Sequence, residues 1–236
     1  MRYKMSVVVF LFFTINTNAQ IKTKPTVKRY LFHSHGISFQ KFNNLDNRIK
    51  AYSQYEQLKN TTGTLQFGFF TEYKNNFIIG YSGNFGSSLS GDKNKKSSST
   101  KFIGGAIDVG YCIFKTNRVS IFPYAGLGFE EFKAVFNKDI STIAFDSVLA
   151  SNNVRQRTER LIFTNAFAIY RAGLGTFVTS KKHPQNSIGL QVGYSGSFGE
   201  KDWKINNTQS LFNSPKDKLS KISASILIRY ELKRKV

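Results

Sequence analysis

Alternation of apolar and polar residues dominates the chain and constrains its fold more than any other feature. In residues 187–199, Ile188, Leu190, Val192 and Tyr194 alternate with serine, glycine and glutamine. A period of two places the apolar side chains on one face of a β-strand and leaves the other face polar. Eight segments show this pattern. With an error of about two to four residues at each end, we place the strands at 29–42, 62–74, 76–88, 100–114, 119–134, 160–178, 187–199 and 218–232.

Short and long connections alternate between these strands. The short ones lie near Asn75 and at 115–118 and 181–186, and the long ones at 43–61, 89–99, 137–159 and 200–217. An even number of antiparallel strands with apolar outer faces, polar inner faces and loops of this pattern is typical of an outer-membrane β-barrel. Closure of the barrel pairs every backbone group, as lipid requires. No run of about 18 apolar residues occurs, which excludes a spanning helix.

The sequence therefore predicts an all-β fold, an eight-stranded antiparallel up-and-down transmembrane barrel with short periplasmic turns and long extracellular loops. Both termini are expected in the periplasm. The alternative is a soluble lipocalin-like barrel or sandwich, in which the apolar face points inward. Two features oppose that alternative: the polar faces hold glycine, serine, asparagine and inward charges, and the apolar faces carry tyrosine and phenylalanine near strand ends, like the aromatic girdles of membrane barrels.

The first residues resemble a secretory signal peptide. Arg2 and Lys4 precede an apolar stretch at 7–13, and Thr17-Asn18-Ala19 offers a small residue at the cleavage position. A buried N-terminal strand is the alternative. We predict a signal peptide at 1–19, a periplasmic segment at 20–28 and the barrel at 29–236, exported to the bacterial outer membrane.

An internal echo supports the strand register. The sequence Gly-Tyr-Ser-Gly-Asn-Phe-Gly at 80–86 recurs as Gly-Tyr-Ser-Gly-Ser-Phe-Gly at 193–199. Each copy has an outward glycine, Gly83 or Gly196, between outward aromatic residues. An aromatic ring from a neighbouring strand can cover such a glycine in a curved sheet.

Three motifs resemble those of the small outer-membrane β-barrel domain family, which contains PorT-like and OmpA-type barrels. They are Asn18-Ala19-Gln20, the Phe-Pro-Tyr-Ala-Gly-Leu-Gly-Phe strand at 122–129 and Ile78-Ile79-Gly80-Tyr81. The resemblance covers residues 29–236. It implies the barrel fold and the membrane, and assigns no catalytic residue.

The first strand carries two histidines and leaves its own phase open. His33 and His35 share a face with Ile37 and Phe39, and a β-bulge near Ser34 would switch the phase of the strand. Two histidines at this spacing offer two metal ligands. The sequence shows no evident third ligand, so a pair of interfacial histidines is the preferred interpretation.

Catalytic motifs are not evident. The chain has no Gly-rich phosphate loop, no GxSxG elbow and no HExxH pattern. His35 with Ser38 is the only nearby base and hydroxyl, and no third group marks a triad. The single cysteine, Cys112, excludes intramolecular disulfides and is expected to be a small buried residue. We expect no catalytic residue, no metal and no cofactor.

Strand parity places charged side chains inside the barrel. An eight-stranded barrel is just wide enough for its own side chains, so we expect a packed, ion-paired interior that conducts nothing. A narrow polar pathway is the alternative. Asp108 and Arg171 are expected to pair at similar depth, with Arg229 as the rival partner. The predicted interior charges are Glu72, Asp108, Glu130, Arg171, Lys221, Arg229 and Glu231.

The long loops are the expected working surface. Leu45, Ile49, Tyr52 and Leu58 have near-helical spacing in the first loop, which indicates a short helix. The second loop is a basic tip, expected either to contact anionic glycolipid of the outer leaflet or to be merely solvated. The residues for that contact are Lys93, Lys95 and Lys96.

Basic residues also surround the short-turn end, in the set Lys22, Lys24, Lys28, Arg29, Lys74, Lys115, Arg118, Lys181, Lys182, Lys233, Arg234 and Lys235. The chain has 34 Lys+Arg against 14 Asp+Glu, a net charge of +20. Because the positive charges lie at both ends of the barrel, nucleic acid is excluded as a partner.

The pattern favours a non-enzymatic protein with a structural, surface-interaction or envelope-accessory role. Its partners are expected to be outer-membrane lipids and other envelope proteins. A narrow channel for small or hydrophobic solutes is the first alternative, and a lipid-modifying enzyme of the outer membrane is the second.

Overall fold

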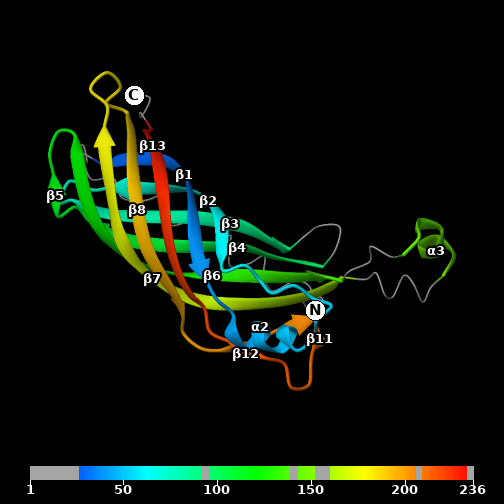
Figure 1. The fold of residues 1–236 in the computed structure, drawn as a ribbon. Helices are drawn as coiled ribbons and strands as arrows, with labels where there is room; N and C mark the ends of the chain where they lie inside the picture. The colour runs from blue at the N-terminus through cyan, green and yellow to red at the C-terminus, as the bar shows by residue number, and fades with distance from the viewer. Residues whose placement is uncertain (1–26, 92–95, 139–142, 152–159, 206–208, 233–236) are drawn as a thin grey trace, which may run out of the picture.

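A computed structural model gives the structure of the chain and describes residues 27–91, 96–138, 143–151, 160–205 and 209–232. Eight antiparallel strands form a closed barrel in the order β1-β2-β3-β4-β6-β7-β8-β13, with β13 paired to β1 (Figure 1). The strands are β1 (Lys28–Gln40), β2 (Thr61–Glu72), β3 (Phe77–Gly91), β4 (Ser97–Tyr111), β6 (Val119–Asn137), β7 (Leu161–Thr179), β8 (Asn186–Ser197) and β13 (Ser220–Glu231). The predicted fold class is confirmed.

The two ends of the barrel differ. One end, here called the turn end, carries the connections 73–76, 112–118 and 180–185, and β5 (Phe114–Lys115) pairs with β6 there. The other, the helix end, carries α2 (Asn43–Lys50), α3 (Phe145–Ala150) and four short strands. These strands are β9 (Lys201–Asp202), β10 (Lys204–Ile205), β11 (Gln209–Ser210) and β12 (Lys216–Asp217). The helix predicted from the spacing of Leu45 and Ile49 is α2. Within the described residues, no helix is both long and apolar enough to cross a membrane.

Strand β1 is continuous. Its register with β13 runs without interruption from Tyr30↔Glu231 to Gln40↔Lys221, and its register with β2 is equally regular. A β-bulge would break one of these ladders, so the bulge considered near Ser34 is absent. Ser34 is buried and points inward, whereas His33 and His35 lie on the outer face.

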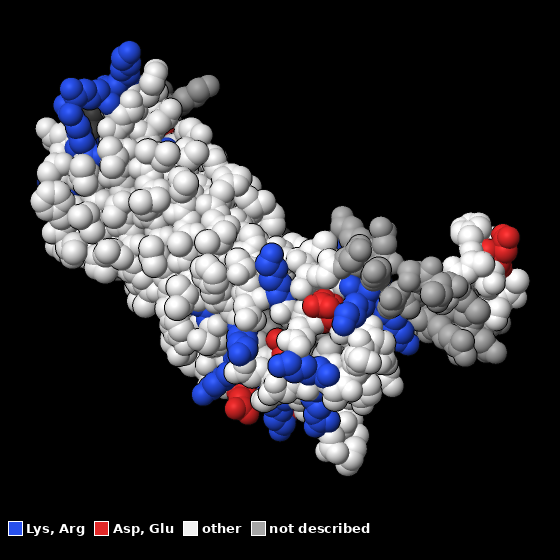
Figure 2. Space-filling view, viewed as in Figure 1, with Lys and Arg blue, Asp and Glu red and all other residues white. Residues whose placement is uncertain are grey.

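The apolar faces point outward, as the alternation predicts. On β8, Ile188, Leu190 and Val192 are each more than half exposed, whereas Ser187 and Ser195 are buried. On the face of the barrel that Figure 2 shows, a broad band without charged side chains lies between basic groups at the two ends of the barrel. The wall of the barrel is therefore suited to hydrocarbon.

The loop predicted at 89–99 is wrong in extent. Strand β3 continues to Gly91 and β4 begins at Ser97, and Gly91 pairs with Ser97. Serine and threonine make up most of 87–91 and 97–100, and the strand pairing continues through them. At the other end β4 stops at Tyr111 rather than near 114, because Ile113 N–H donates to Ile121 O, 3.0 Å away, in the β5–β6 turn.

The two outward glycines of the repeated sequence, Gly83 and Gly196, differ in whether an aromatic ring covers them. A Cβ added to Gly196 would lie 2.6 Å from the ring of Tyr170, so that ring covers the glycine. A Cβ at Gly83 would meet only Gly104 O, at 3.9 Å. A neighbouring ring therefore covers Gly196, as predicted, but not Gly83.

Candidate functional site

The interior of the barrel holds three layers of side chains, and the helix end holds the first. This helix-end cluster combines strand residues with residues from the loops. Phe42 is its centre, with its ring 5.0 Å from Phe132, 5.1 Å from Trp203 and 6.3 Å from Phe167. The cluster consists of Phe42, Leu45, Ile49, Leu58, Phe102, Phe132, Ala134, Phe136, Phe167, Ile169, Trp203 and Leu219, all buried.

Asp217 joins the two loops that meet in this cluster. The carboxylate is buried and accepts hydrogen bonds from Asn44 N–H at 2.9 Å, Leu45 N–H at 3.1 Å and the Trp203 indole N–H at 2.8 Å. The first two donors belong to the first turn of α2, where backbone N–H groups lack partners within the helix. Asp217 therefore fixes both the start of α2 and the orientation of Trp203.

Asp46 holds the other end of the same loop. Its Oδ1 accepts a hydrogen bond from Leu58 N–H at 3.1 Å. Burial raises the pKa of the Asp46 carboxyl, although this hydrogen bond opposes the rise. The conformation of this loop is therefore coupled to the protonation of the buried Asp46 carboxyl.

The middle layer is polar. Lys221 forms an ion pair with Glu130, and both side chains are buried. Asn84 Nδ2–H also donates to Glu130 Oε1, at 2.8 Å. The Lys221 ammonium lies 4.3 Å from the centre of the Phe102 ring, so it also makes a cation–π contact with the helix-end cluster.

Asp108 and Arg171 lie in the same layer and are in contact. Arg171 Nε is 3.2 Å from Asp108 Oδ1. Neither atom makes a hydrogen bond, so the interaction is an ionic contact. The guanidinium also lies 5.5 Å from the centre of the Tyr124 ring.

The turn end holds the third layer, the turn-end cluster of Tyr30, Phe32, Phe70, Ile78, Cys112, Phe122, Tyr124, Phe177 and Leu227. Arg229 lies among these rings, 4.0 Å from the centre of Phe177 and 4.4 Å from that of Tyr30. No ion pair of Arg229 with Asp108 occurs among the described residues. Cys112 is buried and forms no disulfide.

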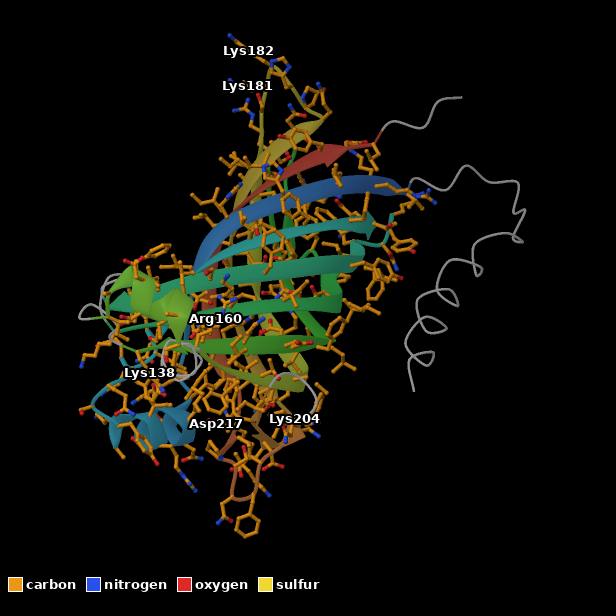
Figure 3. All side chains as sticks on the ribbon, turned by 90° about the vertical axis from the view of Figure 1, so that its right-hand side faces the viewer. Lys138, Arg160, Lys181, Lys182, Lys204 and Asp217 are labelled. Atoms are coloured by element: carbon orange, nitrogen blue, oxygen red, sulfur yellow. The ribbon has the colours of Figure 1, made fainter. Side chains whose placement is uncertain are left out.

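The remaining interior charges predicted from parity lie at the rim of the turn end. Glu72 is buried and paired with Lys115 from β5. Glu231 pairs with Lys28 at 3.4 Å. Of the basic residues expected around this end, Lys181 and Lys182 stand at its tip (Figure 3). Five of that set lie outside the described residues, namely Lys22, Lys24, Lys233, Arg234 and Lys235.

The spaces left among these side chains are small. An apolar cavity of ≈ 50 Å³ lies within the turn-end cluster, beside Phe70 and Asp108, and a polar cavity of ≈ 40 Å³ lies in the middle layer, beside Glu130 and Lys221. Each has room for a few water molecules. Unpaired polar atoms border these spaces, among them Glu130 Oε2 and Asn84 Oδ1.

The histidines do not form a site with Ser38. Ser38 points inward, is fully buried and donates to Gln40, whereas His35 is on the outer face. The His33 and His35 rings are 5.7 Å apart, and His33 also stacks on Tyr230 at 5.9 Å. Within the described residues, no group of three or more potential metal ligands comes together.

Of the three lysines predicted to form the basic tip of the second loop, the structure describes Lys96. Lys96 is 3.8 Å from Glu56 in an ion pair, and its Nζ also donates to Ser53 O at 3.5 Å. The contacts of Lys96 therefore hold the two loops together. Lys93 and Lys95 lie outside the described residues.

Sequence reasoning missed Trp203, Asp217 and the aromatic interior. The inward phenylalanines carried a signal, because the parity that places Glu130 inside also places Phe132 and Phe136 there. Trp203 and Asp217 lie in a loop without periodicity, so no pattern marked them.

Comparison with known proteins supports the fold. No known family matches the chain, and no curated protein matches it. Among solved structures, it is similar to a major outer membrane protein of Thermus thermophilus, with 11% identity over 87% of this chain and 100% of that one and a TM-score of 0.52.

Two further similar structures are Neisserial surface protein A and Ail, the attachment invasion locus protein of Yersinia pestis. The first has 9% identity, coverage of 86% and 97% and a TM-score of 0.48. The second, in complex with the heparin analogue sucrose octasulfate, has 14% identity, coverage of 86% and 99% and a TM-score of 0.46. At these identities the likeness concerns the fold of small outer-membrane barrels alone, and the PorT-like and OmpA-type resemblance stays a prediction.

Proposed function

We propose that this protein is an integral outer-membrane barrel that conducts nothing through its interior and acts through its outer surface, in a structural or envelope-accessory role. The observation that carries the proposal is the filling of the interior by aromatic side chains at both ends. Among the described residues, the cavity in the polar middle layer is only ≈ 40 Å³ and the one inside the turn-end cluster is only ≈ 50 Å³. A solute would have to displace buried rings to pass.

The location in the outer membrane is part of the proposal. It is supported by the uncharged outer band, the fold shared with outer-membrane barrels and the signal-like residues at the start of the sequence. With the turn end in the periplasm, the cell surface presents α2, α3 and β9–β12. Partners at that surface are lipids and envelope proteins.

A narrow channel is the second candidate, and the polar middle layer favours it. Asp108, Glu130, Arg171 and Lys221 would line such a path. The aromatic clusters on either side of this layer weigh against it. An enzyme acting on outer-membrane lipid is a weaker candidate, because His35 and Ser38 lie on opposite faces of β1.

Planar bilayers test the main proposal. The refolded wild-type protein, with insertion verified by a heat-modifiable band, should give no unitary conductance. Ohmic single-channel steps from the wild type would overturn the proposal in favour of the channel. Density-gradient fractionation of the producing cells tests the location, and recovery in the inner membrane or the soluble fraction would contradict it.

A further inference from the structure

Three lysines form a line across the outer wall at the helix end. Lys101 on β4 is the direct register partner of Lys133 on β6. Lys133 is the partner of Thr164 on β7, and Thr164 is the partner of Lys204 on β10. Direct partners in antiparallel strands point to the same side, and neighbouring strands are about 4.8 Å apart. The three ammonium groups therefore project from one transverse row.

The row carries an excess of positive charge. All three lysines are exposed, and none forms an ion pair with another described residue. Like charges directly opposite in a sheet are unfavourable, so the Lys101–Lys133 pair gains most from an anion between them. Glu131 is the nearest acid on this face by register, and it leaves a positive excess.

A pocket lies at the Lys204 end of this row. It has a volume of ≈ 430 Å³ and lies between the barrel wall and the segment of β9 and β10. Asn165 Nδ2–H donates to Lys201 O at 2.8 Å, which holds that segment against the wall. Lys201 and Lys204 stand at the pocket with Glu131 and Asp202, and Asp202 is 3.9 Å from Lys216 in an ion pair. Figure 3 shows Lys204 at the end of the barrel opposite Lys181 and Lys182.

Apolar surface begins below the row, beside and beyond Glu131, which is the register partner of Ile103. Ile103, Leu127 and Phe129 are each more than 60% exposed on the outer face. The Phe129 ring packs towards Gly105 on β4, 3.2 Å from where a Cβ would stand, while the Tyr170 ring covers Gly196 on β8.

Because these rings lean to opposite sides, the small side chains of β7 between them stay open. Ala166 and Ala168 are both exposed there. They form an apolar strip, here called the furrow, that leads away from the lysines and passes Glu131, the register partner of Ala166. A ligand that matches both parts has anionic groups at one end and hydrocarbon chains at the other.

We propose that the row of Lys101, Lys133 and Lys204 binds the phosphate groups of an anionic glycolipid of the outer leaflet, with acyl chains along Ala166 and Ala168. The inference rests on the proposed outer-membrane location and names the lipid contact of that surface. It moves the contact from the basic tip, where Lys96 is already paired with Glu56, to the wall. The furrow selects a lipid over a soluble polyanion.

Native mass spectrometry of the refolded full chain tests the site with bisphosphorylated lipid A and with the same lipid after enzymatic dephosphorylation. The wild type should bind the phosphorylated form at least tenfold more tightly. The triple variant K101Q/K133Q/K204Q should lose at least tenfold in affinity for it. The matched control K74Q/K181Q/K182Q removes the same charge at the turn end and should bind like the wild type.

Three outcomes would overturn the proposal. Equal binding by the triple variant would show that the row is not the site, and an equal loss in the control would show that only net charge matters. Lysine-dependent binding of sucrose octasulfate, with no binding of lipid A, would assign the row to a soluble polyanion. A heat-modifiable band verifies the fold of each variant. Because the assay uses purified protein, its result is independent of the conductance and fractionation tests.

Discussion

Asp108 on β4 and Arg171 on β7 touch across the intervening strand because Gly126 of β6 is the register partner of both. A Cβ at Gly126 would overlap the Asp108 side chain. The absence of a side chain at this one position lets the two charges meet, with side-chain exposures of only 10% for Arg171 and 17% for Asp108.

The Asp108→Ala variant is expected to lose about 3–5 kcal/mol of stability, because it leaves the Arg171 charge buried and unpaired. Adding Arg171→Met should recover part of that loss, since no unpaired charge then remains. The urea midpoint of the heat-modifiable folded band measures both effects. Additive losses in the double variant would mean that the two residues do not interact.

Arg229 provides the matched control for this cycle. Its guanidinium lies over the rings of Phe177 and Tyr30 rather than beside Asp108. Asp108→Ala combined with Arg229→Met is therefore expected to show additive losses. A recovery of stability in this double variant would show that Arg229, rather than Arg171, is the partner of Asp108.

The barrel and its register were predictable because period-two patterning is a local property that closure converts into geometry. Parity placed Asp108 and Arg171 inside, and their distances along the strands from the short turns at 115–118 and 181–186 placed them at similar depth. The same parity placed Phe132 inside, yet its packing partners Phe42 and Trp203 come from loops without periodicity. These two loop side chains reach the barrel interior because of long-range contacts, such as the hydrogen bonds of Asp217 with α2. No sequence pattern indicates such contacts.

Removal of the Asp217 carboxylate should loosen the helix-end cluster. Asp217→Ala leaves two backbone N–H groups and the Trp203 indole without their acceptor, at about 1–3 kcal/mol for each buried group. Trp203 is the only tryptophan, so its fluorescence reports on this site alone. The variant should show a red-shifted emission and stronger quenching by iodide.

The control for that experiment is Asp202→Asn. Asp202 lies next to Trp203 in the chain but is more than half exposed, and its contact with Lys216 spans 3.9 Å. Exposed pairs of this kind contribute little, so the fluorescence should stay as in the wild type. Unchanged emission in Asp217→Ala itself would show that the carboxylate does not hold the indole.

The stability of the helix end should rise as the pH falls, through Asp46. Burial raises the pKa of this carboxyl in the folded state, so the folded protein binds the proton more tightly than the unfolded chain does. Its destabilising contribution is full above the folded pKa and disappears below the unfolded value of about 3.9. In Asp46→Asn this part of the pH dependence should vanish. Urea midpoints followed by Trp203 emission, measured from about pH 3.5, which lies below the unfolded value, up to neutral pH, test this, and identical pH slopes in both proteins would refute the coupling.

The orientation of the barrel can be read from single cysteines at its two ends. Ser98 is unsuitable for labelling, because it is fully buried and donates to Gln57 O at 2.6 Å. Asn47 on α2 and Asn117 in the 112–118 turn are both exposed. With long loops outside, a membrane-impermeant maleimide should label Asn47→Cys on intact cells and should label Asn117→Cys only after the outer membrane is permeabilised.

The wild type serves as the control, because its one cysteine, Cys112, is buried and should not react in the folded protein. Labelling of Asn117→Cys alone on intact cells would invert the topology and would place the Lys101–Lys133–Lys204 row in the inner leaflet, away from the glycolipid proposed for it.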